Sequence, residues 1–241
     1  MNVNEIVRIV PTLKVNNRKL NERFYIETLG MKPLLEESAF LSLGDQTATE
    51  RLILEEAPSM RTRRVEGLKK LARLLIKVEN PSEIEALLSQ MKPLPRLFKG
   101  NRGYAFEIVS PEEDVILVHA ENDVRDLVPL ETVPEFYSNT GIKYVSKFEV
   151  SMELRLPEGT ESLLDPEGVA PVITFTKGQG PDLAVENNVT WDLTMLKFLV
   201  KNFDLTSLRQ KFEKTGYFVP KSEKFFLGKD TNNIELWFEE A

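Results

Sequence analysis

Apolar and polar positions alternate near the start of the chain. Between residues 8 and 15, Ile9, Leu13 and Val15 fall on one face and Thr12 falls on the other. A period of two residues is typical of a half-buried strand. The pattern therefore predicts a first strand that covers an apolar core with one face and leaves its other face for a different role.

A short helix is expected directly after this strand. Asn16 and Asn17 suit a turn and a helix N-cap, and Gly30, at the end of the phrase FYIETLGM, suits a helix stop. The segments PLLEESAFLSLG and ATERLILEE follow, and each is long enough for a strand or a hairpin. The first unit is therefore predicted as one strand, one helix and about three strands.

The same order recurs further along the chain. The second unit is predicted as the strand LARLLIKV, the helix NPSEIEALLSQM, and the strands GYAFEIV and DVILVHA around the turn SPEED. The last unit runs from TWDLTMLKFLV through the helix LTSLRQKFEKTG to IELWFEE. Between them, KFEVSMELRL predicts a strand and PVITFTK another, but little helix fits between the two. This third unit is a degraded copy of the pattern.

Residues 121–146 match no unit. They carry apolar residues such as Leu127, Val128 and Leu130, too many for a free tether, so we predict a partly packed linker. The chain is then divided into an N-terminal domain of two paired units over residues 1–120, the linker, and a C-terminal, degenerate paired domain over residues 147–241.

Four units of this kind, with FYIETLGM in the first and an apolar strand after SPEED in the second, resemble the vicinal oxygen chelate superfamily, which includes glyoxalase I and bleomycin-resistance proteins. Over its whole length the chain resembles the CppA family of Gram-positive cocci, whose members are described as complement C3-degrading proteinases. The resemblance implies an α+β fold in which paired βαβββ modules form cup-shaped mixed sheets in two domains. It also implies that a ligand binds inside a cup.

In metalloenzymes of the superfamily, His, Gln or Glu residues on the first and last strands of the modules project into the cup. The resemblance places Val10 or Thr12, Arg73 and Leu117 at such positions here. Because an arginine opposes a bound cation, we expect no metal ion and no other cofactor in this domain. The residues expected to contact a ligand there are Thr12, Arg51, Arg73, Leu117 and His119.

Two of these assignments have structural alternatives. His119, the only histidine, is suited to ligand binding or proton transfer, and it equally suits a strand end where backbone or water satisfies the ring. Arg51 and Arg73 suit recognition of a carboxylate or phosphate, and a structural salt bridge with Glu55 is the favoured alternative.

The C-terminal units offer a different set of candidates. Glu235 falls at the superfamily's ligand position, and Glu149 and Glu153 share one strand face. Converging carboxylates without histidine suit Mg²⁺ or Ca²⁺. Acids on an exposed strand are also the ordinary protection of a sheet edge, and Met195 stands where a partner ligand is expected. Edge protection is therefore the favoured interpretation.

Composition narrows the function classes. The chain has 241 residues, 31 Lys and Arg against 38 Asp and Glu, a net charge of −7, and no cysteine. The negative charge argues against nucleic acid and anionic membranes as partners, and the missing cysteine excludes disulfides and a thiol nucleophile. No window approaches the roughly 18 apolar residues of a membrane span, and no signal peptide is evident. We expect a cytoplasmic protein, or a surface or extracellular one if the family description applies.

The sequence contains few of the residue patterns that a proteinase needs. HExxH and GxSxG are absent, and a Ser-His-Asp arrangement would have to use His119 as its base, which makes His119 the one candidate catalytic residue. Three hypotheses stay open: a metal-free small-molecule binder of the bleomycin-resistance type, a protein that binds complement C3, and a proteinase acting by another mechanism. A homodimer is compatible with each.

Overall fold

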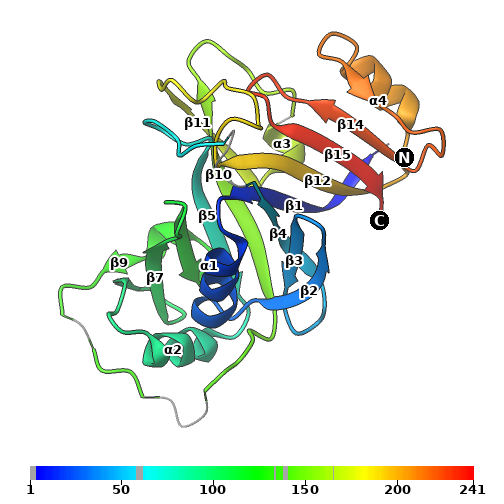
Figure 1. Cartoon of the computed structure of the whole chain (residues 1–241). Coiled ribbons are helices and arrows are strands. Elements are labelled where there is room, and N and C mark those ends of the chain that lie inside the picture. The colour runs from blue at the N-terminus through cyan, green and yellow to red at the C-terminus, as the bar shows by residue number, and fades with distance from the viewer. Residues whose placement is uncertain (1–3, 58–61, 133, 138–140, 165) are drawn as a thin grey trace.

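The computed structural model describes residues 4–57, 62–132, 134–137, 141–164 and 166–241. Two mixed β-sheets dominate it, and short helices pack against them (Figure 1). The α+β class and the glyoxalase-like cup architecture expected from the resemblance are confirmed. Among the described residues, no helix is both long and apolar enough to cross a lipid bilayer.

The first sheet has eight strands in the spatial order β13-β14-β15-β12-β1-β4-β3-β2. Their bounds are β1 Glu5–Val15, β2 Lys32–Glu37, β3 Phe40–Gly44, β4 Glu50–Glu56, β12 Leu193–Lys201, β13 Tyr217–Phe218, β14 Phe225–Lys229 and β15 Glu235–Glu240. The sheet thus combines the strands of the first unit with those of the last.

The second sheet has seven strands in the order β11-β10-β5-β8-β7-β6-β9. Their bounds are β5 Leu71–Val78, β6 Arg96–Lys99, β7 Tyr104–Val109, β8 Val115–His119, β9 Val128–Pro129, β10 Phe148–Pro157 and β11 Ile173–Gly178. This sheet combines the second unit with the degraded third one, and the linker adds β9 to its edge.

The units therefore pair differently from the prediction. At the centre of the first sheet β1 runs antiparallel to β12, and in the second sheet β5 runs antiparallel to β10. Each sheet crosses the division at residues 121–146 that we drew along the sequence. The alternation of a strand specifies which face it buries but not which distant strand it joins, so the sequence pattern left this choice open.

The helices and helical turns are α1 Arg18–Arg23, the π-helical turn η1 Phe24–Thr28, α2 Pro81–Gln90, the 3-10 turn η2 Val124–Asp126, α3 Pro166–Val169 and α4 Leu205–Lys211. Asn17 caps α1 by accepting a hydrogen bond from the Leu20 backbone N–H, as expected. FYIETLGM forms η1 and the turn after it, where Gly30 adopts a φ of +67°. Tyr25 in this phrase is fully buried.

Buried carboxylates hold the two sheets together. Asp192, just before β12, accepts hydrogen bonds from the backbone N–H groups of Lys70 (2.6 Å) and Leu71 (3.2 Å) at the start of β5. Asp45, just after β3, accepts one from the backbone N–H of Phe148 in β10 (3.4 Å). Around these links a single hydrophobic core draws residues from both sheets. The two sheets therefore form one packed body.

Candidate functional site

The inner face of the first sheet forms a hollow of about 470 Å³, which we call the first cup. Strands β2, β3 and β4 supply one wall and β12 and β15 the other. Its lining residues are Leu35, Glu37, Ser38, Phe40, Ser42, Glu50, Ile53, Met195, Lys197, Trp237 and Glu239. The first cup is therefore built from the first and last units of the chain.

The floor of the first cup is set by strand register. Thr12 of β1 lies opposite both Ile53 of β4 and Met195 of β12, and Met195 lies opposite Glu235 of β15. Thr12 is fully buried, and its Oγ1 has no hydrogen-bond partner among the described residues. Superfamily metalloenzymes carry their metal ligands on these strands. Here the same strands bring together the hydroxyl of Thr12, the alkyl side chain of Ile53 and the thioether of Met195.

Aromatic rings form the walls of the first cup. Trp237 stacks on Phe225 with ring centroids 3.8 Å apart and planes 15° apart. On the opposite wall Phe40 keeps 43% of its surface exposed. Flat aromatic faces of this kind are favourable partners for planar apolar molecules.

One cation lies among the acids of the first cup. The Lys197 ammonium contacts Glu50 at 2.5 Å and Glu239 at 3.6 Å, and the Trp237 Nε1–H donates to Glu239 at 2.8 Å. The first cup thus combines an apolar floor with one polar rim, the usual composition of a small-molecule site.

Arg51 does not face the first cup. Gly44 of β3 pairs with Glu50 whereas Leu43 pairs with Leu52, so Arg51 is the extra residue of a β-bulge. The bulge reverses the alternation, so Glu50 and Ile53 line the first cup while Arg51 points away and pairs with Asp45 (3.1 Å). The salt bridge expected between Arg51 and Glu55 is therefore not formed, and Glu55 pairs with Lys14 instead (3.4 Å).

A second hollow, of about 740 Å³, lies where the two sheets meet, and we call it the junction hollow. Its lining includes Arg8 and Arg51 from the first sheet and Lys77, His119, Glu149 and Glu153 from the second. The structure thus separates the predicted ligand residues: Thr12 is buried opposite the first-cup residues Ile53 and Met195, whereas Arg51 and His119 line the junction hollow.

The second sheet brings Arg73, Leu117 and His119 onto adjacent strands. Leu117 pairs with Leu75 and is buried in a small apolar cluster with Phe98 and Ala105. Arg73 pairs with Glu153 at 2.6 Å. The structural salt bridge expected for Arg73 therefore exists, with Glu153 in place of Glu55.

His119 is 5% exposed and lies opposite Lys77 on the neighbouring strand. Burial, and then the positive charges of Lys77 and Arg73, lower the pKa of His119 to about 4, although a hydrogen bond with the Glu121 backbone acts in the opposite direction. The ring is therefore neutral near pH 7. Its Nδ1 has no hydrogen-bond partner among the described residues.

The candidate metal carboxylates do not converge. Glu149 and Glu153 lie on β10 in the second sheet, and Glu235 lies on β15 in the first. Over the described part of the chain, no group of three or more His, Asp or Glu side chains is placed to hold a metal ion. The donor set that the fold family implies therefore does not fit: the floor of the first cup offers Thr12, Ile53 and Met195 beside Glu235, and the rim carboxylates Glu50 and Glu239 are paired with Lys197.

Sequence reasoning missed several residues of the first cup. Leu35, Phe40 and Lys197 were not proposed, although Lys197 follows Met195 by two positions and so shares its face. That spacing would have indicated that Lys197 faces the first cup, provided that the pairing of β12 with β1 was known. For Leu35 and Phe40 the path of β2 and β3 had to be known first.

Comparison with known proteins agrees with this architecture. The CppA N-terminal family model matches residues 8–130, and the CppA C-terminal model matches residues 145–238. The crystal structure of the cppA protein from Streptococcus pneumoniae TIGR4 has 66% identity and a TM-score of 0.96, with 100% of each chain covered. No curated protein matches the chain.

More distant structures share the fold alone. A candidate dioxygenase from Bacillus subtilis subsp. subtilis str. 168 has 12% identity and a TM-score of 0.58, with 99% of this chain and 86% of the other covered. A glyoxalase I mutant from Zea mays has 12% identity and a TM-score of 0.54, with 97% of this chain and 93% of the other covered. The glyoxalase-like fold therefore extends over the whole chain.

Proposed function

The chain belongs to the CppA family, and from that premise we propose that it binds a small, largely apolar molecule in the first cup without a metal ion. One observation carries the proposal. Thr12, Ile53 and Met195 meet at the floor, on the strands where metalloenzymes of this fold hold their ion. We infer that the inherited metal site has been replaced by an apolar binding floor.

The size and lining of the first cup support such a ligand. A volume of about 470 Å³ falls within the range of small-molecule sites. The exposed face of Phe40 and the Trp237–Phe225 stack suit a planar, aromatic group. Lys197, between Glu50 and Glu239, would orient a polar substituent at the rim.

Cleavage of complement C3, which the family resemblance implies, is less well supported. A proteinase needs an activated nucleophile or an activated water, and His119 is the one imidazole that could serve as base. Its low pKa and its cationic neighbours Lys77 and Arg73 oppose protonation of the ring, so it is a poor proton acceptor. We therefore favour binding over catalysis, with C3 as a candidate partner.

Incubation with complement C3 tests whether the protein cleaves C3 or leaves it intact. Purified C3 is incubated with the wild-type protein and with His119→Ala, each dialysed against EDTA. We expect the C3 chains to stay intact in both. Cleavage by the wild type that His119→Ala abolishes would identify His119 as an essential base and overturn the preference for binding.

Ligand binding is tested by thermal unfolding of EDTA-dialysed protein with neutral aromatic fragments such as 2-naphthol. A ligand that binds the native state raises the unfolding midpoint in a saturable manner. Phe40→Ala should weaken the binding about fivefold, since an aromatic contact contributes on the order of 1 kcal/mol. Tyr137→Ala, at a site 82% exposed and outside the first cup, is the matched control. Equal shifts in both variants would contradict the proposal.

A further inference from the structure

The junction hollow lies between two strand edges that lack hydrogen-bonded neighbours. β1 pairs with β4 only from Thr12 onward, and β10 pairs with β11 only from Met152 onward. The first halves of β1 and β10 therefore leave one edge each unpaired, and Val7–Ile9 and Glu149–Ser151 line the hollow there. Unpaired strand edges present backbone donors and acceptors.

One of these backbone donors can be identified. Phe148 N–H donates to Asp45, and Met152 N–H donates to the Val172 carbonyl (2.8 Å), both on the side of β10 away from β5. Since alternate residues of a strand donate to the same side, the Val150 N–H points to that side too. Val150 lines the junction hollow, so its N–H is directed into it.

Side-chain nitrogens add further donor capacity. Arg8 Nε, Arg73 Nε and His119 Nδ1 are buried without a hydrogen-bond partner among the described residues. Arg8 and His119 line the junction hollow, and Arg73 is held at its border by its pair with Glu153. Buried polar groups without partners are uncommon and costly, so the unpaired N–H groups of Arg8 and Arg73 at this hollow indicate a missing acceptor.

The other basic groups around the junction hollow are already engaged. Arg51 pairs with Asp45, Lys77 donates to the Asn122 side chain (3.0 Å), and Arg125 pairs with Asp123. Arg8 has no ion-pair partner among the described residues. Its guanidinium and the Lys77 ammonium, whose partner Asn122 is neutral, are therefore the charges that a ligand would neutralise.

The geometry points to a binding site for a small carboxylate in the junction hollow, anchored by Arg8 and completed by the Val150 N–H, with the His119 ring beside them. A guanidinium forms paired hydrogen bonds with a planar carboxylate. Glu149 and Glu121 also line the hollow, and their charges disfavour a doubly charged phosphate relative to a carboxylate with a single charge. The site shares no lining residue with the first cup, so it is independent of the proposed function.

The single histidine gives a direct test. The imidazole of His119 contributes the only histidine signal in a ¹³C–¹H NMR spectrum, and it lies in the junction hollow. The full-length protein is titrated with sodium acetate at constant ionic strength, with sodium phosphate as the comparison. We expect the His119 signal to move and saturate with a carboxylate.

Two variants of Arg8 test whether its guanidinium binds the carboxylate. Arg8→Gln should weaken carboxylate binding at least about tenfold, since a charge-assisted hydrogen bond is removed. Arg8→Lys should restore part of it, which separates a lost charge from a folding defect. Arg64→Gln, at an exposed arginine that pairs with Glu113, should bind as the wild type does. An unmoved His119 signal, a response to phosphate alone, or equal binding by Arg8→Gln would overturn the proposal.

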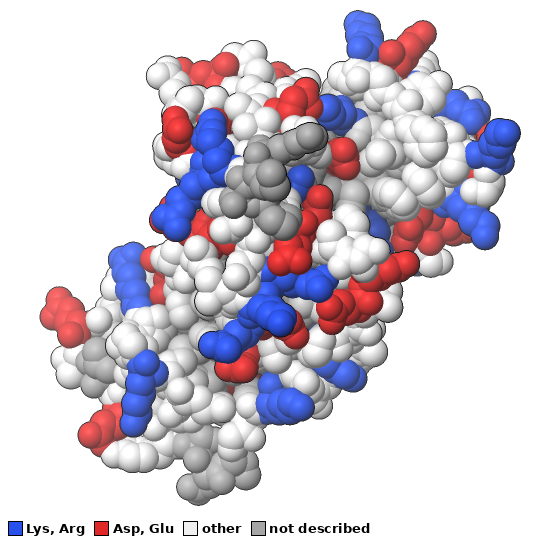
Figure 2. Space-filling view, viewed as in Figure 1, with Lys and Arg blue, Asp and Glu red and all other residues white. Residues whose placement is uncertain are grey.

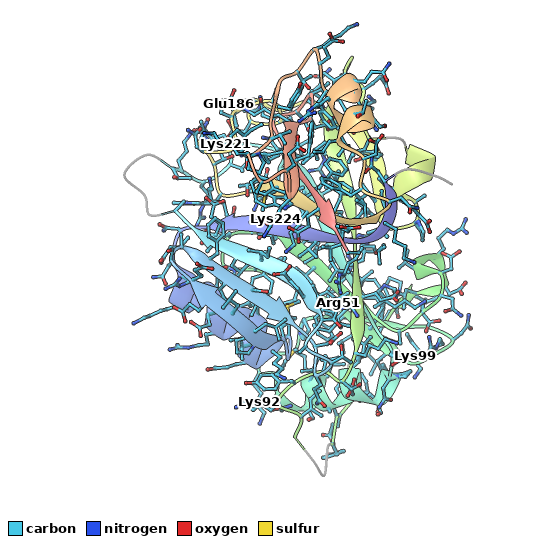
Figure 3. All side chains as sticks on the ribbon, turned by 90° about the vertical axis from the view of Figure 1, so that its right-hand side faces the viewer. Arg51, Lys92, Lys99, Glu186, Lys221 and Lys224 are labelled. Carbon is cyan, nitrogen blue, oxygen red and sulfur yellow. The ribbon has the colours of Figure 1, made fainter. Side chains whose placement is uncertain are left out.

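Figure 3 labels Arg51, which lines the same hollow, near the middle of the molecule, whereas Lys92 and Lys221 lie towards opposite ends. In Figure 2 acidic and basic side chains are interspersed over the visible face. The face drawn in Figure 2 therefore carries no broad patch of a single charge.

Discussion

Thr12 and Met195 lie directly opposite one another on antiparallel strands, although Thr12 belongs to the first unit of the chain and Met195 to the last. This pair joins the two halves of the first cup. It means that the site exists only when the two ends of the chain have folded together.

A disulfide can report the pairing of the units. The chain has no cysteine, so Thr12→Cys combined with Met195→Cys introduces two thiols into an otherwise thiol-free protein. Opposed residues on antiparallel strands have Cα atoms about 4.5–5.5 Å apart, which permits a disulfide. We expect oxidation to close it, with a loss of both free thiols by mass spectrometry. Thr12→Cys with Leu75→Cys should stay reduced, because Leu75 lies in the second sheet. The opposite outcome would mean that the units pair in sequence order.

Asp45 should contribute strongly to stability. It is fully buried, pairs with Arg51 and accepts a hydrogen bond from the Phe148 N–H. Asp45→Asn removes the charge and should lower the free energy of unfolding by about 2 kcal/mol, as for other hydrogen bonds to charged groups. Urea denaturation measures this change in the free energy of unfolding. Glu223→Gln, in an exposed pair with Arg209, is the control and should leave the midpoint unchanged.

His119 should make stability depend on pH. Burial, Lys77 and Arg73 lower its pKa to about 4 in the fold, against about 6.5 in the unfolded chain, so the unfolded chain binds more protons between these values. The contribution of neutral His119 to the free energy of unfolding is therefore fully present above pH 6.5. It falls as the pH drops towards 4, by about 3 kcal/mol in total.

The control for this pH dependence is His119→Gln, which cannot titrate there. The difference in the free energy of unfolding between wild type and variant, measured at several pH values, removes the contribution of the acids. If that difference stays constant between pH 7 and pH 4, the imidazole is not held neutral by its surroundings.

Gly30 should be sensitive to any side chain. Its φ of +67° disfavours residues with a Cβ, and an added Cβ would lie 3.1 Å from Val145 and 3.2 Å from Leu87. Gly30→Ala should lower the free energy of unfolding by about 1–2 kcal/mol. Gly141→Ala, where a Cβ meets nothing closer than 3.8 Å, should have little effect in the same denaturation assay.

Local structure could be predicted from the sequence because it depends on neighbouring residues. The alternation around Thr12 predicted the strand and its two faces, and Asn17 predicted the helix cap. The Met195–Lys197 spacing carried similar information about the inner face of β12. The prediction of a half-buried strand was wrong, because Val10, Thr12 and Lys14 on the second face of β1 are buried as well.

Pairing over long distances could not be predicted in this way. Nothing in the alternation of β1 distinguishes β12 from β5 as its neighbour, since both are first strands of similar units. The bulge at Arg51 depends on how β3 and β4 meet, and it reversed the predicted direction of that side chain. Arg8 escaped attention because the junction hollow exists only once both sheets are assembled.

The two tryptophans provide the most direct test of metal-free binding in the first cup. Trp237 lines the first cup, whereas Trp191 lines neither hollow and donates its Nε1–H to the Ala57 carbonyl (2.9 Å). Their indole N–H signals in a ¹⁵N–¹H spectrum, assigned with Trp191→Phe, are followed while 2-naphthol is added in the presence of EDTA. We predict that the Trp237 signal shifts and saturates while the Trp191 signal stays in place. A Trp237 signal that moves only after a divalent metal is added, or that does not move at all, would contradict the account.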